Sequence, residues 1–266
     1  MLWTQIVEPR PFAGWRLVCF PHAGGSPYFF RDWGGALPWA EVHAVCYPGR
    51  AERFGEPCAT DLTAMAREIA VELLAPDDDR PLALFGHSMG ATVAYEVTRA
   101  LEAAGRTVRH LFASGARAPQ SHVPDSAAAA TWDEAAITRT LVELGGTEPE
   151  LLRNRAFVEL VLPYIGADFR MLAAYGGGSA RPLACPLTAL VGADDPRVTA
   201  AQTAAWGEVT RGAFARHTLP GGHFYLEQAP PHEVLATVLG AGASSGLTGR
   251  DTSPPARTPG PATACG

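Results

Sequence analysis

Short apolar runs alternate with longer amphipathic patterns along most of the chain. Six of these runs predict strands, and several are apolar without alternation, which is typical of strands buried on both faces of a sheet. Four other segments have the apolar spacing of helices. This order predicts an α/β fold with a mostly parallel sheet flanked by helices. The predicted strands are 16–20, 42–47, 81–85, 108–114, 187–192 and 214–219, and the predicted helices are 61–74, 91–104, 199–208 and 232–239.

Residues 122–175 interrupt this alternation, because they contain no convincing strand pattern. Helical patterns near 132–144, 149–161 and 163–175 predict a helical insertion between two strands, which spans about residues 120–178. Long excursions of this kind often form a lid over a site. The alternative is a set of packing helices that gate nothing.

The last part of the chain has a different composition. Residues 242–266 are rich in Gly, Ser, Thr and Pro and offer almost no side chain that a core could bury. Such a composition cannot compensate for the entropy lost on folding, so it predicts a disordered tail. The preceding residues 1–241 are long enough for one domain with a sizeable core.

Composition and charge exclude several classes of function. The formal net charge is −6, all 21 cationic side chains are arginine, and no basic stripe occurs, which argues against nucleic-acid binding. No stretch approaches the length of a membrane span, and the start of the chain lacks the apolar run of a signal peptide. The five cysteines are scattered without a metal-binding pattern. We therefore expect a cytoplasmic protein without disulfides, bound metal, or membrane or nucleic-acid partners.

The segment Gly-His-Ser-Met-Gly at 86–90 matches the G-x-S-x-G nucleophile elbow, with a predicted strand before it and a predicted helix after it. A serine in such a strained turn is lifted clear of the backbone, and side chains at Gly86 and Gly90 would collide with the adjacent strand and helix. The helix that follows directs its N-terminal N–H groups at developing negative charge. Ser88 is therefore the candidate nucleophile, and an inert serine in a glycine-rich turn is the alternative.

A serine nucleophile needs a base that an acid orients, and in this fold class the chain order is Ser, Asp or Glu, His. Of the eight histidines, His223 stands in a glycine-containing loop after the last predicted strand, where the base should be. His217 is the second candidate, but its apolar strand pattern predicts a buried structural side chain. The acid should follow the preceding strand, where Asp194 and Asp195 are adjacent. We favour Asp195, with its neighbour capping the turn or the next helix, but the residue pattern barely separates the two.

The oxyanion formed in acyl transfer needs two N–H donors. One is the amide of the residue after the nucleophile, Met89. The other comes from a loop after an early strand, and Pro-His-Ala-Gly-Gly at 21–25 directly follows a predicted strand. We therefore expect the amide of Ala23 to be the second donor, and an ordinary glycine-rich loop is the alternative.

Five segments in order along the chain resemble the type II thioesterases, the stand-alone editing enzymes of polyketide and non-ribosomal peptide synthesis. They are FPHAGGSPYFF, YPGRAERFGEP, LFGHSMGATVAYEV, LVGADDPRV and LPGGHFYLEQ. The resemblance covers about residues 3–240, and it extends less closely to the thioesterase domains of fatty acid synthases. It implies an α/β-hydrolase fold with a helical lid inserted after the sixth strand.

By position, the resemblance implies the same set of functional residues. The acid of the family ends a G-x-x-D pattern, which falls on Asp195 in this chain. The chain departs from the family at Gly166, where the family usually has arginine in the last lid helix. A glycine inside a helix costs about 0.5–1 kcal/mol relative to alanine, so we expect a looser lid. The implied residues are Ser88 as nucleophile, Asp195 as acid, His223 as base, and Ala23 and Met89 as oxyanion donors.

The resemblance implies hydrolysis of acyl thioesters held on the phosphopantetheine arm of acyl or peptidyl carrier proteins. It implies no separate cofactor, because phosphopantetheine arrives with the substrate. A general carboxylesterase or a fatty-acyl thioesterase with the same triad is one alternative, and a non-catalytic binding protein on this fold is another. Carrier proteins are usually acidic, so arginines near the site entrance would dock them. The candidates, against the alternative of plain solvated arginines, are Arg50, Arg53 and Arg117.

Overall fold

The computed structural model describes residues 2–75, 78–125, 132–146, 150–177 and 181–240. The chain divides into two compact units, residues 1–232 and residues 233–266. The described part of the second unit consists mostly of helix α7 (His232–Val238), which begins at the last residue of the first unit. The predicted tail at 242–266 lies outside the described residues.

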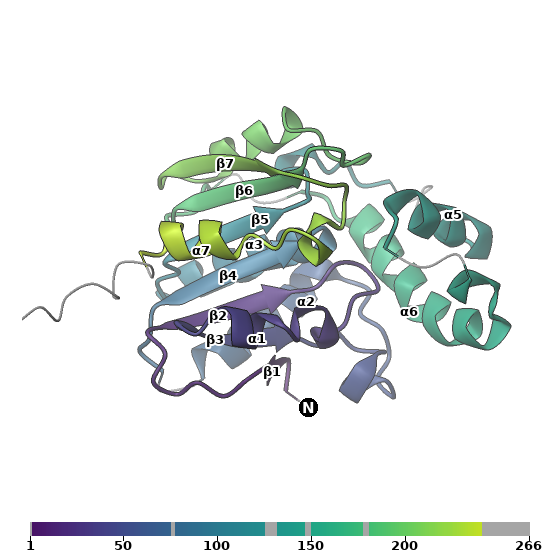
Figure 1. Cartoon of the computed structure of the whole chain (residues 1–266), viewed down its shortest axis with the longest axis horizontal. Coiled ribbons are helices and arrows are strands. Elements are labelled where there is room, and N and C mark those ends of the chain that lie inside the picture. The colour runs from purple at the N-terminus through teal and green to yellow at the C-terminus, as the bar shows by residue number, and fades with distance from the viewer. Residues whose placement is uncertain (1, 76–77, 126–131, 147–149, 178–180, 241–266) are drawn as a thin grey trace, which may run out of the picture. The chain divides into compact units, whose positions relative to one another are not determined.

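A seven-stranded sheet forms the centre of the first unit (Figure 1). Its strands are β1 (Thr4–Ile6), β2 (Trp15–Phe20), β3 (Ala40–Val45), β4 (Leu82–His87), β5 (His110–Ser114), β6 (Leu187–Gly192) and β7 (Phe214–Leu219). Their order is β1-β3-β2-β4-β5-β6-β7. Every neighbouring pair from β3 to β7 is parallel, and β1 pairs antiparallel with β3. The predicted mostly parallel sheet is therefore confirmed.

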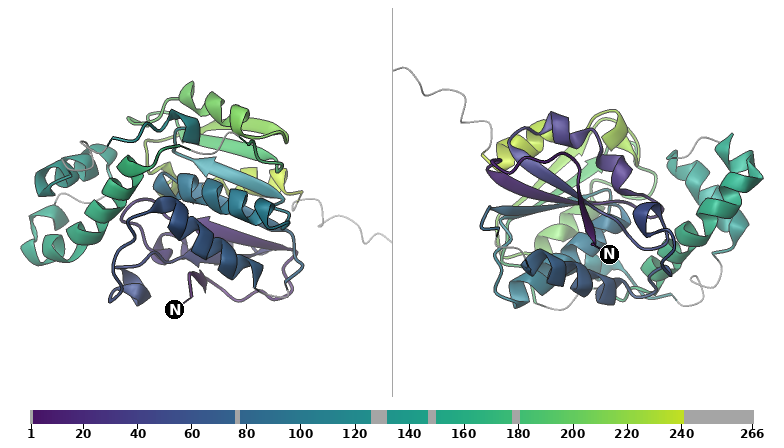
Figure 2. Two further views of the ribbon diagram at one scale, coloured as in Figure 1. Left: turned by 180° about the vertical axis from the view of Figure 1, so that it is seen from behind. Right: turned by 90° about the horizontal axis from the view of Figure 1, so that it is seen from below.

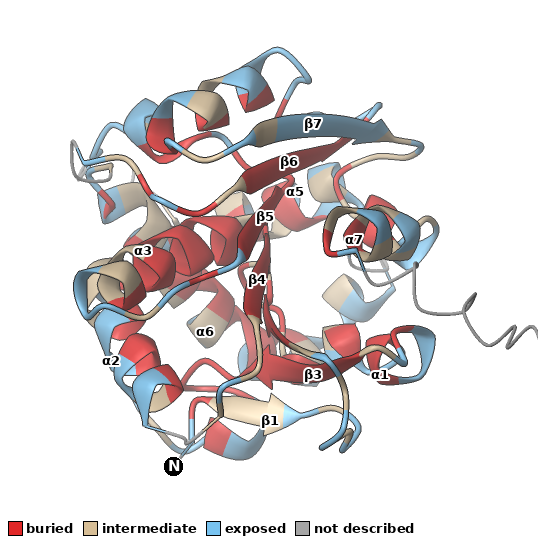
Figure 3. Cartoon of the chain, turned by 90° about the vertical axis from the view of Figure 1, so that its left-hand side faces the viewer, coloured by how far each residue is buried: buried red, intermediate tan, exposed pale blue. Residues whose placement is uncertain are grey.

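The burial of the strands explains their sequence patterns. Strands β2 to β6 are buried along nearly their whole length, whereas the edge strand β7 is exposed at most positions (Figure 3). A strand covered on both faces has no side for polar residues, so its apolar run is unbroken. The sequence pattern did not predict β1, because its three partly exposed residues carry no such run.

Helices cover both faces of this sheet. Helices α2 (Leu62–Leu74) and α3 (Met89–Ala103) pack side by side on one face, and the short α1 (Trp33–Ala36) lies on the other (Figures 2 and 3). Helix α3 begins just after the end of β4 and contacts β2, β4 and β5, so it crosses the middle of the sheet. The predicted α-helix at 199–208 is wrong in type. Residues Gln202–Val209 form 3-10 turns, which include Gly207, a poor helix former.

The insertion between β5 and β6 contains helices α5 (Glu134–Leu144) and α6 (Arg155–Ala174), which stand together to one side of the sheet (Figure 1). It follows the fifth strand along the chain, whereas the resemblance implied the sixth. The two predicted helices 149–161 and 163–175 are also wrong, because α6 is one helix with Pro163 inside it. An interior proline costs about 3 kcal/mol. Helix α6 continues because apolar side chains on both sides of the proline are buried.

Gly166 lies where α5 packs against α6. A Cβ atom at this position would come within 2.9 Å of the Ile137 side chain and 3.0 Å of the Arg170 guanidinium. The glycine therefore permits close packing of the two insertion helices, and an arginine in its place would displace both neighbours. This close contact between α5 and α6 differs from the looser lid that we expected from a glycine at position 166.

Two further properties concern the described residues alone. None of their helices has both the length and the apolar character needed to cross a membrane. No group of His, Cys, Asp and Glu among them is arranged to hold a metal ion. The cysteines with free thiols are Cys19, Cys46, Cys58 and Cys185.

His110 on β5 makes the stability of the fold depend on pH. Its ring Nε2 lies 2.9 Å from the Thr188 hydroxyl inside the sheet, and burial lowers its pKa to about 4. In the unfolded chain a histidine has a pKa of about 6.5, so between these two values only the unfolded state takes up the proton. The folded state therefore loses stability as the pH falls from about 6.5 toward 4.

We expect His110→Asn to make the stability of the protein less sensitive to acid. Between pH 7 and pH 5, the free energy of unfolding should fall by about 2 kcal/mol more in the wild type than in the variant. Urea unfolding at both pH values measures this difference. His217→Asn is the control, because His217 is exposed on β7. An equal pH dependence in the wild type and His110→Asn would contradict the prediction.

Candidate active site

Ser88 occupies the sharp turn between β4 and α3, and its backbone is strained. Its φ of 55° and ψ of −122° lie in a region that residues other than glycine rarely adopt. Such a conformation costs roughly 1–3 kcal/mol and persists only where the surroundings impose it. One imposing contact is a hydrogen bond of 2.8 Å from the Ser88 N–H to the Ser114 carbonyl oxygen on β5. The structure thus contains the strained strand–turn–helix arrangement that the elbow motif predicts.

The two glycines of the motif allow backbone segments to approach closely. A Cβ atom at Gly86 would lie 2.1 Å from the carbonyl oxygen of Gly90. A Cβ atom at Gly90 would lie 2.1 Å from the carbonyl oxygen of Phe20 at the end of β2. Both distances are far shorter than any van der Waals contact, and in both cases the colliding atom belongs to the backbone. The spacing of the motif therefore follows from the contact of α3 with β4 and β2.

Three side chains that are far apart in the sequence meet at this turn. The Oγ of Ser88 lies 3.1 Å from Nε2 of His223, and Nδ1 of His223 lies 2.8 Å from Oδ2 of Asp195. The other Asp195 oxygen accepts hydrogen bonds from the N–H groups of Arg197 and Val198, at 2.8 and 3.1 Å. These two hydrogen bonds hold the carboxylate oxygen that does not contact the imidazole. The carboxylate favours the tautomer in which Nδ1 of His223 carries the proton. In that tautomer Nε2 is free to accept the proton of the serine hydroxyl.

The structure separates the pairs of candidates that the sequence left open. Asp195 is buried against the imidazole, whereas the neighbouring Asp194 is exposed and its N–H donates to the Gly221 carbonyl oxygen. His217 lies on β7 with an exposed side chain, so the buried environment predicted for it is wrong. The reason is that β7 is the edge strand of the sheet. His223 is therefore the histidine that contacts Ser88, and Asp195 is the aspartate that contacts His223.

The residues predicted to supply the oxyanion donors lie on two sides of the serine. Met89 is the first residue of α3 and lines the cavity at Ser88, at the positive end of the helix dipole. Ala23 lies in the loop after β2, is 9% exposed, and does not line that cavity. Within the described part of the chain, no residue accepts a hydrogen bond from the Ala23 N–H. Donation of these N–H groups to a substrate stays a prediction.

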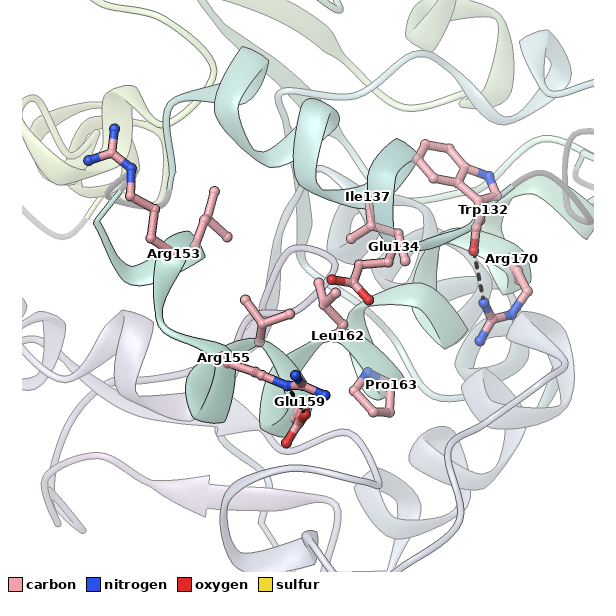
Figure 4. A pocket seen from close by; sticks show the side chains of 11 residues that line it. Trp132, Glu134, Ile137, Arg153, Arg155, Glu159, Leu162, Pro163 and Arg170 are labelled. Atoms are coloured by element: carbon pink, nitrogen blue, oxygen red, sulfur yellow. Dashed lines mark hydrogen bonds and ion pairs between the residues drawn. The ribbon is translucent and has the colours of Figure 1, made fainter.

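A cavity of about 250 Å³ adjoins Ser88 and His223. Its apolar wall comes from both the core and the insertion, and includes Val123, Leu144 and Phe169. A larger cavity of about 590 Å³ lies between α5 and α6 (Figure 4), but neither Ser88, His223 nor Asp195 lines it. The smaller cavity is the candidate substrate site, because it contains the reactive side chains.

Two further histidines lie beside His223, and neither was predicted to belong to the site. The ring of His87 lies 5.1 Å from that of His223, and the ring of His22 lies 6.1 Å from that of His87. Burial, together with repulsion from His223 when that ring is protonated, lowers the pKa of His22 to about 3 and that of His87 well below its usual range. Both rings are neutral near pH 7. The signal in the sequence that could have placed them at the site was their position inside the glycine motifs at 21–25 and 86–90.

Two of the three predicted docking arginines are buried, so that prediction is wrong for them. Arg50 is 2% exposed and pairs with Asp168 of α6, and Arg53 is 7% exposed and pairs with Glu56. A buried guanidinium cannot contact a protein partner. Arg117 is exposed and lines the cavity at Ser88.

Comparisons with known proteins show the family of the chain. A family model described as thioesterase domain matches residues 15–240. The chain is 38% identical over 227 residues to a probable cadicidin biosynthesis thioesterase of Streptomyces griseus, a match that covers 85% of this chain and 62% of that relative. It is 40% identical over 239 residues to a Brevibacillus parabrevis protein named linear gramicidin dehydrogenase LgrE, covering 88% of this chain and 89% of the relative.

A solved structure shows the same architecture. The type II thioesterase BorB from the borrelidin biosynthetic cluster matches with a TM-score of 0.80 and 36% sequence identity, covering 89% of this chain and 97% of that chain. The likeness confirms the predicted α/β-hydrolase fold.

Proposed function

The chain belongs to the thioesterase domain family, and we propose from this that it is an editing thioesterase of polyketide or non-ribosomal peptide biosynthesis. Its substrates are acyl thioesters on the phosphopantetheine arm of acyl or peptidyl carrier proteins. The observation that carries the proposal is the chain of contacts from Ser88 through His223 to Asp195 at the edge of a cavity. Two thioesterase relatives are named for biosynthetic pathways, which supports a substrate from such a pathway.

In the first half-reaction, the Oγ of Ser88 attacks the thioester carbonyl carbon while Nε2 of His223 takes the hydroxyl proton. Asp195 holds the imidazole in place and stabilises the imidazolium. The oxyanion accepts hydrogen bonds from the N–H groups of Met89 and Ala23. Collapse of the tetrahedral intermediate breaks the C–S bond, and the departing thiolate takes the proton from His223. A thiol has a pKa of about 8.5, so it leaves more readily than an alcohol or amine.

In the second half-reaction, a water molecule attacks the ester on Ser88 while His223 takes one of its protons. The new tetrahedral intermediate collapses, and the C–O bond to Ser88 breaks. His223 then returns the proton to the serine oxygen, and the carboxylic acid departs. Each residue ends in its starting state, so these steps need no cofactor beyond the phosphopantetheine that arrives with the substrate.

The size of the cavity favours short acyl groups. Sites for drug-sized ligands have volumes of about 300–1,000 Å³, whereas the cavity at Ser88 has about 250 Å³. Phe169 and Trp132, whose rings stack at 4.5 Å, form part of its wall. Small acyl groups that block a synthase fit this space better than a long product chain, which is the selectivity that editing requires.

We expect the protein to hydrolyse short acyl-pantetheine thioesters without any added cofactor. Its kcat/KM for the thioester should exceed that for an aryl ester of the same acyl group, and Ser88→Ala should lower kcat by at least about 1,000-fold, because the nucleophile is removed. A strong preference for the oxygen ester favours a general carboxylesterase, and a preference for long chains favours a fatty-acyl thioesterase. Unchanged hydrolysis in Ser88→Ala would contradict the proposed nucleophile.

The two neighbouring aspartates form a matched pair of variants. Asp195→Asn should lower kcat by about 10,000-fold, because an amide in this place favours the wrong imidazole tautomer. Asp194→Asn should retain nearly full activity, since its side chain is exposed and away from the imidazole. Steady-state kinetics of the two variants on one thioester make the comparison. Equal losses in both variants would show that the acid is wrongly assigned.

We propose that Arg117 contributes to docking of an acidic carrier protein, since its guanidinium is exposed at the cavity. Arg117→Glu should raise KM for a carrier-bound substrate by about ten-fold relative to KM for the same acyl group on free pantetheine. The ratio of the two KM values isolates docking, because both substrates undergo the same chemical steps. An unchanged ratio at low ionic strength, where charge effects are largest, would rule out this docking role.

A further inference from the structure

A buried carboxylate on the insertion links helix α6 to the loop that contains Ala23. Asp168 is 2% exposed, and its Oδ2 accepts a hydrogen bond of 2.8 Å from the N–H of Gly24. Both carboxylate oxygens also accept hydrogen bonds from the guanidinium of Arg50. The carboxylate therefore holds a backbone N–H of the loop and is itself fixed by a buried cation.

Arg50 is fixed on several sides. Its guanidinium lies between the rings of Tyr47 and Tyr164, at 5.3 and 4.8 Å from their centroids. One of its nitrogen atoms also lies 3.4 Å from the Gly25 carbonyl oxygen. The hydroxyl of Tyr47 donates a hydrogen bond of 3.1 Å to the Pro21 carbonyl oxygen. The loop at 21–25 is thus held by groups from the segment after β3 and from α6.

The position of these contacts connects them to the proposed chemistry. Gly24 directly follows Ala23, so the bond to Asp168 fixes the peptide plane next to the proposed oxyanion donor. Helix α6 contacts the same residue a second time, because a Cβ atom at Gly24 would come within 2.8 Å of the Ile165 side chain. The φ of Gly24 is +78°, a conformation that suits glycine.

We propose that Asp168 is a positioning residue for the oxyanion hole: its carboxylate, by accepting the Gly24 N–H, orients the loop so that the Ala23 N–H faces the reacting carbonyl. The oxyanion hole is then complete only while α6 is docked on the loop. This inference rests on the proposed function, since it assigns Asp168 a role in stabilising the oxyanion.

The energetics of buried ion pairs separate this role from a purely structural one. Replacing both members of such a pair by uncharged residues is often neutral or stabilising, whereas removing one member costs about 3–5 kcal/mol. We therefore expect variants that are uncharged at both positions to fold. Single variants would leave an unpaired buried charge and could unfold, so the test uses double variants.

The experiment compares Arg50→Met/Asp168→Asn with Arg50→Met/Asp168→Leu. Both variants are uncharged at this site and similar in volume, but the amide oxygen of asparagine can accept the Gly24 N–H and leucine cannot. We expect the asparagine variant to keep kcat within about three-fold of the wild type. The leucine variant should lose about 100-fold in kcat with little change in KM, because small displacements of catalytic groups have effects of this size.

A second readout does not depend on the identity of the substrate. In labelling by a fluorophosphonate probe, the Ser88 Oγ attacks phosphorus, fluoride leaves, and the phosphoryl oxygen gains negative charge that the same N–H donors stabilise. The labelling rate should therefore fall in the leucine variant alone. Glu41→Gln/Arg80→Met removes the ion pairs of Arg80 with Glu41 and Asp78, away from Ser88, and is the control that should leave the labelling rate unchanged. Urea unfolding should show similar stability for the two test variants.

The outcomes distinguish this inference from the proposed function. Equal labelling rates in the asparagine and leucine variants, with both folded, would overturn the role of Asp168 whatever the substrate is. A wild-type protein that reacts with the probe but hydrolyses no thioester would contradict the proposed function. In that case, labelling still decides whether Asp168 positions the loop.

Discussion

The turn from β4 into α3 brings backbone segments closer together than side chains would allow. Gly86 and Gly90 permit this approach, and the strain that results falls on Ser88. The turn is held between the ends of β2 and β5, so the serine has one position relative to the sheet. The loops after β6 and β7 bring an aspartate and a histidine to that fixed point. All these groups therefore meet at the carboxyl ends of parallel strands, where α/β sheets bind ligands.

The insertion contributes to this site in two physically different ways. It supplies apolar wall to the cavity at Ser88, through residues such as Phe169. It also supplies the buried carboxylate of Asp168, which contacts the loop after β2. A lid that only covered the site would need the first contribution alone. In the proposed role of Asp168, the second makes the position of the proposed donor Ala23 depend on the docking of α6, so one helix would serve both selection of the acyl group and stabilisation of the oxyanion.

Structural features that depend on local sequence patterns could be predicted. Features that depend on contacts between distant segments could not. Buried strands gave unbroken apolar runs, and chain order pointed to His223. The choice of Asp195 needed a family pattern, because two adjacent aspartates differ only in where the turn directs them. The continuity of α6 through Pro163 depends on packing that spacing does not record. The ion pair of Arg50 and Asp168 joins residues 118 positions apart, so Arg50 resembled an ordinary surface cation.

The central claim is that Ser88 carries the acyl group between the two half-reactions. Rapid quenching of the reaction with a short acyl-pantetheine thioester, followed by mass spectrometry of proteolytic peptides, tests it most directly. The account predicts that the peptide containing Ser88 gains the mass of the acyl group, and that this species forms and decays at least as fast as turnover. Turnover with no acyl group on Ser88, or with the acyl group on another side chain such as Cys58, would contradict the account.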